Sequence, residues 1–148
     1  MKETTYDFRA QSFVRWIKLA DEHLSAANLL VQSAPWHAAF WYHQAGERYL
    51  KACLVGRGQA FPNALTQLRR LLEMCSGLQA QFERIVSLEA LDRISEWETA
   101  FAYPPESLQP DPAIPGLTEL KSAQRICEAL RALALKDPSA KGHTDAQH

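Results

Sequence analysis

Apolar residues recur at intervals of three and four through most of the chain, which is the period of an α-helix packed on one face. No segment alternates apolar and polar residues as a half-buried strand does. Pro35 and Gly77 mark two breaks, because proline favours the first turn of a helix and glycine the residue after its end. The pattern predicts helices over residues 10–32, 36–54, 64–75, 78–101 and 117–135. We therefore expect an all-α fold, an antiparallel up-and-down bundle of about five helices.

The segment 36–54, WHAAFWYHQAGERYLKACL, is apolar or small nearly all round, yet it carries one polar stripe. Gln44, Glu47 and Lys51 follow steps of three and four, so a helix places them one above another. A carboxylate and an ammonium on such a central helix must be paired, or must face a cleft or a partner. Two interpretations stay open. Either a partly buried Glu47–Lys51 pair fixes helix packing, or the stripe lines a groove or a subunit interface.

Composition narrows the class of protein. The 148 residues suit one domain, and a formal net charge of -1 argues against a strongly basic nucleic-acid binder. The chain lacks the uninterrupted apolar run of a transmembrane helix, so no membrane is expected as a partner. The first residues also lack the apolar core of a secretion signal. We expect a cytoplasmic protein.

The pattern also divides the chain. Residues 1–9 form an N-terminal lead-in, residues 10–135 the helical domain, and residues 136–148 a flexible C-terminal tail with no apolar residue larger than alanine or proline. Within the domain, residues 103–116 contain five prolines of the eight in the chain, which excludes a helix there. This proline-rich stretch is either a lid or a connection.

Candidate chemical groups are sparse. Cys53, Cys75 and Cys127 are odd in number, widely spaced and in helical segments, so we interpret them as reduced core residues. His43 and Glu47 are four positions apart, which would let a carboxylate orient an imidazole. A metal site needs more convergent ligands than this pair supplies. Nucleophile, phosphate-loop and dinucleotide motifs are missing, so we predict no metal and no cofactor.

Residues 44–52, QAGERYLKA, carry a resemblance to a known family. They are similar over nine positions to a phrase common in the HEPN domain family of small prokaryotic helical proteins. Two further landmarks are degraded. The family usually has histidine and aspartate where this chain has Thr66 and Gln67, and an arginine where Ala102 precedes Tyr103. The resemblance covers about residues 10–135.

The resemblance implies a four- to five-helix bundle that usually forms a homodimer. Many such proteins are encoded beside a minimal nucleotidyltransferase, as one half of a toxin–antitoxin type of pair. Active members are metal-independent ribonucleases that use an arginine and a histidine separated by four to six residues. Arg15 and His23 come nearest to this spacing here, one residue too far apart. The usual nuclease motif of the family is therefore missing from this chain.

Together these observations favour a binding or regulatory module over an enzyme. Its ligand or partner contacts would be Gln44, Glu47, Lys51 and Tyr103, and the ligand a nucleotide, an RNA or the nucleotidyltransferase partner itself. One alternative is a divergent metal-independent ribonuclease, a toxin, with His43 and Arg48 as relocated catalytic residues. A second alternative is a purely structural dimerisation domain, in which the stripe only specifies pairing.

Overall fold

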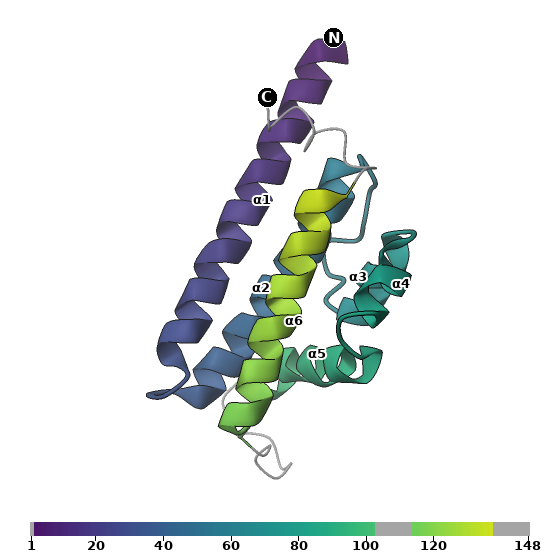
Figure 1. Ribbon diagram of the computed structural model, residues 1–148. Helices are drawn as coiled ribbons and strands as arrows, with labels where there is room; N and C mark the ends of the chain where they lie inside the picture. Colours follow the sequence, from purple (N-terminus) through teal and green to yellow (C-terminus); the bar gives the residue numbers. More distant parts are fainter. Residues whose placement is uncertain (1, 103–113, 138–148) are drawn as a thin grey trace.

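The computed structural model describes residues 2–102 and 114–137, with side chains described for residues 12–98 and 114–137. Within those ranges the chain is helical and has no strand. The helices, shown in Figure 1, are α1 (Lys2–Leu30), α2 (Pro35–Gly56), α3 (Leu68–Met74), α4 (Leu78–Glu83), α5 (Leu88–Ala102) and α6 (Leu117–Lys136). The predicted all-α helical bundle is confirmed.

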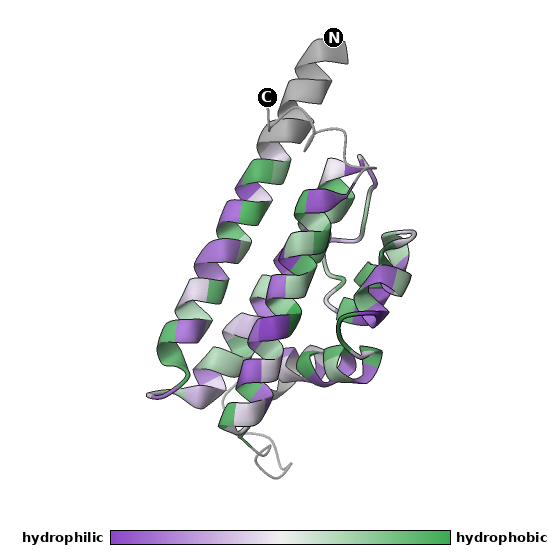
Figure 2. Cartoon of the chain, viewed as in Figure 1, coloured by the Kyte–Doolittle hydropathy of each residue, from purple (hydrophilic) through white to green (hydrophobic). Residues whose placement is uncertain are grey.

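Helix α2 is the central element, and it contacts α1, α3, α5 and α6. Figure 1 shows α1, α2 and α6 as long neighbours, with α1 antiparallel to the other two, and α5 lying crosswise beside α2 and α6. The helices α3 and α4 lie together beside α5, on the side away from α1. Figure 2 shows polar and apolar residues alternating around each coloured helix, as amphipathic helices require. The polar stripe of α2 is thus surrounded by other elements.

Small residues let α1 and α2 approach closely. Ala20 and Ala27 of α1 and Ala38, Ala45 and Ala52 of α2 have no exposed surface. The distance between packed helices depends on the side chains at the contact, so alanines at helical spacing permit a close pair. Larger apolar side chains fill the remaining core, and those with the least exposure include Tyr42, Tyr49, Phe13, Phe82, Leu50 and Leu54.

The boundaries differ from the sequence prediction in two places. Helix α1 begins at Lys2, ahead of residue 10, where the strict apolar period starts. The helix predicted over 78–101 is divided, because α4 ends at Glu83 and α5 begins at Leu88. The Ser87 hydroxyl accepts the Ala90 N–H at 3.2 Å, which is the bond of a helix N-cap. Ile85, which continues the apolar period across the break, is 52% exposed.

The ends of α2 and α6 are joined by an ion pair. Arg57 donates from Nε to Asp137 Oδ2 at 2.6 Å and from Nη2 to Oδ1 at 3.0 Å. Asp137, two residues past the predicted end of the domain at residue 135, is buried. The rest of the predicted tail, and residues 103–113 of the proline-rich stretch, lie outside the described residues. None of the described helices is long and apolar enough to cross a membrane.

Candidate functional site

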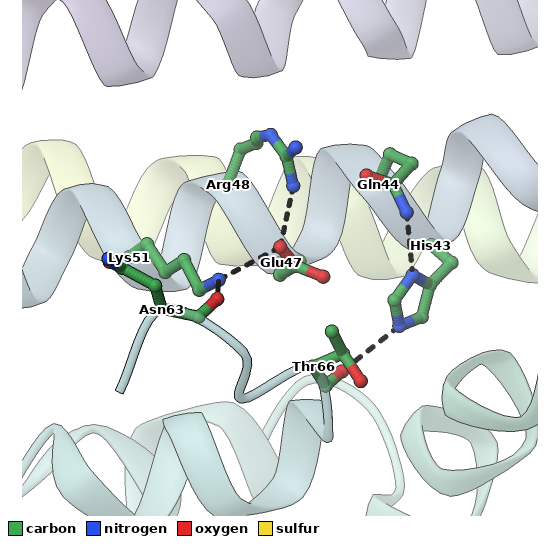
Figure 3. A network of polar contacts seen from close by, with 7 residues as sticks. All are labelled: His43, Gln44, Glu47, Arg48, Lys51, Asn63 and Thr66. Atoms are coloured by element: carbon green, nitrogen blue, oxygen red, sulfur yellow. Dashed lines mark hydrogen bonds and ion pairs between the residues drawn. The ribbon is translucent and has the colours of Figure 1, made fainter. Parts of the chain in front are cut away.

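Seven side chains and backbone groups form a polar network on one face of α2, drawn in Figure 3. Its centre is Glu47, whose Oε2 accepts from Arg48 Nη1 at 2.6 Å and from Lys51 Nζ at 3.0 Å. Glu47 and Lys51 are each 4% exposed. Two charges so removed from water are stable only when paired and hydrogen-bonded. The stripe predicted from the sequence therefore exists, and its charges face inward.

Lys51 also holds the segment that follows α2. Residues 57–67, which we call the return segment, fold back over this face of the helix (Figure 3). Lys51 donates to the Asn63 carbonyl at 3.1 Å and lies 5.6 Å from the centre of the Phe61 ring. A carboxylate, a carbonyl and an aromatic face thus surround the ammonium group. This geometry supports the packing interpretation of the Glu47–Lys51 pair.

His43 fixes the far end of the return segment. Its Nε2 lies 3.0 Å from the Thr66 carbonyl oxygen, and its Nδ1 lies 3.5 Å from Gln44 Nε2. A carbonyl can only accept, so Nε2 carries the proton and Nδ1 is left as an acceptor. Burial lowers the pKa of His43, although the bond to Thr66 and the charges of Glu47 and Glu98 oppose that shift. The imidazole is therefore neutral near pH 7.

His43 and Glu47 were candidates for a direct contact, and their partners lie elsewhere. His43 uses its two ring nitrogens on Thr66 and Gln44. Glu47 turns instead toward Arg48 and Lys51, because a carboxylate binds a cation more strongly than a neutral ring. Among the described residues, Gln44 is linked to the network through His43. Tyr103, the remaining predicted site residue, lies outside the described residues.

His23 of α1, which the sequence analysis considered only for its spacing from Arg15, is a neighbour of the network. Its ring lies 4.8 Å from that of Trp41, and burial followed by the charge of Arg48 lowers its pKa. Within the described part of the chain, three buried side-chain nitrogen or oxygen atoms lack a hydrogen-bond partner: His23 Nδ1, Glu47 Oε1 and Arg48 Nε. In Figure 3 the free oxygen of Glu47 points toward Thr66. The α1–α2 boundary thus carries more polarity than its apolar spacing indicates.

A pocket of about 580 Å³ opens beside Thr66, between α3 and α5. The residues that line it all have polar or charged side chains: Thr66, Gln67, Arg69, Arg70, Glu73, Asp92, Ser95, Glu96 and Glu98. The two walls are tied together, because the Leu68 N–H donates to Ser95 Oγ at 3.0 Å and Arg69 Nε donates to Asp92 Oδ1 at 3.0 Å. We call it the α3–α5 pocket. Sequence analysis missed it, because its charges resemble those of any solvated helix face.

The cysteines are core residues, as predicted. Cys53, Cys75 and Cys127 are buried free thiols. Cys53 donates to Asp137 Oδ2 at 3.2 Å and Cys127 to the Tyr42 carbonyl at 3.3 Å. Hydrogen bonding to Cys75 and burial raise the pKa of Cys53, and burial raises that of Cys127. Thiols of this kind are poor nucleophiles.

Among the described residues, no group of three or more His, Cys, Asp or Glu side chains is placed to hold a metal ion.

The family model of the HEPN domain matches residues 13–136 of this chain. The chain belongs to the HEPN domain family. The matched region begins within α1 and ends at the last residue of α6. It includes both the α2 network and the α3–α5 pocket. Comparisons with curated proteins and with solved structures gave no match.

Proposed function

We propose that this HEPN protein is a noncatalytic binding module that works as a homodimer and forms one half of a pair with a nucleotidyltransferase. The observation that carries the proposal is the state of His43, which has no exposed surface and a proton on Nε2 that is donated to the Thr66 carbonyl. A buried imidazole in this state cannot reach a substrate. The ligand, a nucleotide or the partner protein, is then bound without being cleaved.

Metal-free cleavage of RNA requires a base for the 2′-hydroxyl and a cation for the charge that develops on phosphate. Arg48 is the cation nearest to His43 in the sequence, and its guanidinium is engaged with Glu47 at 2.6 Å. Its Nε is buried. Because the base is inaccessible and the cation neutralised, this geometry favours a binding module over the alternative of a ribonuclease built on His43 and Arg48.

The polar stripe then acts by positioning. Glu47 and Lys51 hold the return segment through Asn63, and His43 holds it through Thr66. Thr66 is also the residue at which the return segment reaches the α3–α5 pocket. In this proposal the network fixes one edge of the pocket, and the open pocket makes the contacts with ligand or partner.

The decisive experiment is an RNA cleavage assay with a mixed RNA pool in the presence of a chelator. We expect no cleavage from wild type in a preparation that circular dichroism shows to be folded and light scattering shows to be dimeric. Cleavage that survives the chelator and is lost in His43→Ala would establish a relocated active site and overturn the proposal. Cleavage that is equal in both proteins and disappears on a second purification would indicate a contaminating nuclease, whereas cleavage that persists would show an active site without His43 and would also overturn the proposal.

A further inference from the structure

The charges of the α3–α5 pocket do not balance. Four carboxylates and two guanidiniums line it, for a net formal charge of -2. Both arginines have acceptors within the lining itself, because Arg69 Nη2 lies 2.9 Å from Asp92 Oδ2 and Arg70 Nη1 lies 3.8 Å from Glu73 Oε2. The excess negative charge therefore belongs to Glu96 and Glu98.

These two carboxylates have different surroundings. Glu96 is exposed on α5, and Glu98 is half-buried. Around the axis of α5, Ser95 lies between the two glutamates. Glu98, three residues later, is on one side of Ser95, and Glu96, the next residue, is on the other side, with Asp92. Ser95 Oγ is already bonded to the Leu68 N–H, so it holds the two walls together. The carboxylates of Glu96 and Glu98 therefore lie on either side of Ser95, whose position is fixed by its hydrogen bond.

A phosphate group is a poor occupant for such a pocket. Its charge would meet a lining whose net formal charge is already -2, and Arg69, one of the two arginines that could bind it, is already paired with Asp92. An occupant with spaced positive charges would satisfy both carboxylates without breaking either ion pair. Complementary charge of this kind steers association and selects between partners.

We propose that the α3–α5 pocket is the docking site for a basic segment of a partner protein, with one Lys or Arg side chain bound by Glu96 and a second by Glu98. This inference rests on the proposed binding function and names its partner chemistry. It assigns the pocket to a protein, and not to a nucleotide. The Ser95 and Arg69 contacts keep the walls at a fixed separation while the segment binds.

The test uses the full-length protein and a short fluorescent peptide in which arginine alternates with serine. Binding is followed by fluorescence anisotropy at low salt, and its location by amide chemical shifts. We expect the Kd to rise by about tenfold in Glu96→Gln/Glu98→Gln and to change less than about twofold in Glu119→Gln/Glu128→Gln. The second variant removes the same charge from exposed positions on α6. The largest shifts are expected at Thr66, Ser95 and Glu96.

Two further probes sharpen the result. A peptide with citrulline in place of arginine keeps the shape and loses the charge, and we expect it not to bind. Spermidine supplies cations without a peptide, and we expect it to compete only weakly. Equal binding to wild type and Glu96→Gln/Glu98→Gln, no binding to either, equal binding of the citrulline peptide, or displacement by equimolar spermidine would each overturn the proposal.

Folding is controlled within the same series. The exposed single variant Glu96→Gln removes one charge, so we expect a smaller rise in Kd and an unchanged circular dichroism melt. A folded Glu96→Gln that binds like wild type also counts against the proposal. None of these outcomes bears on RNA cleavage, so a failure of the docking proposal is distinct from a failure of the noncatalytic assignment.

Discussion

Lys51 Nζ lies 3.0 Å from Glu47 Oε2, and each side chain is only 5% exposed. The two residues are one helical turn apart on α2, and the same ammonium reaches the Asn63 carbonyl in the return segment. An ion pair that elsewhere would stabilise a single helix therefore joins two parts of the chain. In this protein the pair acts as a structural anchor beside the α3–α5 pocket.

Removing one partner of this pair is expected to destabilise the fold. Lys51→Ala leaves the buried Glu47 carboxylate with Arg48 as its remaining cation, so we expect a loss of about 3 kcal/mol in the free energy of unfolding. Replacing both charges, in Glu47→Gln/Lys51→Met, leaves no uncompensated charge and should be milder than Lys51→Ala. Urea denaturation of the three proteins measures this. A Lys51→Ala loss below about 1 kcal/mol would contradict the buried-pair argument.

The pair that joins α2 to α6 makes a second prediction. Asp137 lies at the edge of the described chain, yet its side chain is 1% exposed and accepts two bonds from Arg57. Asp137→Asn keeps the size but leaves Arg57 without its counter-charge, so we expect a loss of about 2–3 kcal/mol in the free energy of unfolding.

The control for Asp137→Asn is Glu73→Gln, which affects the 3.8 Å contact with Arg70 between largely exposed side chains. Exposed pairs contribute little, so this variant should stay within about 0.5 kcal/mol of wild type. Thermal or urea melts of both variants decide the matter. If Asp137→Asn proved as stable as the control, the Arg57–Asp137 ion pair would make no measurable contribution to stability.

Most of the fold follows from the period of the apolar residues, because helices bury a stripe and the stripe is visible in the chain. The divided helix shows where that signal ends. Ile85 keeps the period across the break, although its side chain is exposed, and the determining residue is Ser87, whose capping hydroxyl is a single local signal. A periodic pattern continues through a short break and cannot mark it.

The site was predictable only in part. The spacing of Glu47 and Lys51 was enough to predict their pairing, since both lie on one helix. The attachment of Lys51 to Asn63 and of His43 to Thr66 depends on how the return segment folds, which no periodicity encodes. The α3–α5 pocket is further removed, because Arg69 and Asp92 meet across 23 positions of sequence. Surface charges gain meaning only once the helices are placed.

The capping role of Ser87 is testable by itself. Ser87→Ala removes the acceptor of the Ala90 N–H at the start of α5 and should lower the free energy of unfolding by about 1 kcal/mol. Ser25→Ala, at an exposed interior position of α1, should instead be neutral or slightly stabilising, because alanine favours helices more than serine does. Equal effects of the two substitutions in urea melts would argue against a cap at Ser87.

The buried His43 and the partly buried His23 predict a dependence of stability on pH. Burial lowers the pKa of both His43 and His23 below the ordinary value of 6.5. The unfolded chain therefore binds protons at a pH where the folded protein does not. The contribution of the neutral histidines to the free energy of unfolding is fully present above pH 6.5 and is lost as the pH decreases toward the folded pKa values. Each histidine contributes a slope of at most about 1.4 kcal/mol per pH unit.

Urea melts between about pH 5.5 and 7 measure this slope before most carboxylates begin to titrate. His43→Gln keeps an N–H donor for the Thr66 carbonyl but cannot be protonated, so we expect its slope to fall to the contribution of His23 alone. The double variant His23→Gln/His43→Gln should be nearly flat over the same range. A slope in His43→Gln equal to that of wild type would mean that His43 binds protons in the folded protein as readily as in the unfolded chain. It would then be available as an acid or a base, and the ribonuclease alternative would regain its catalytic group.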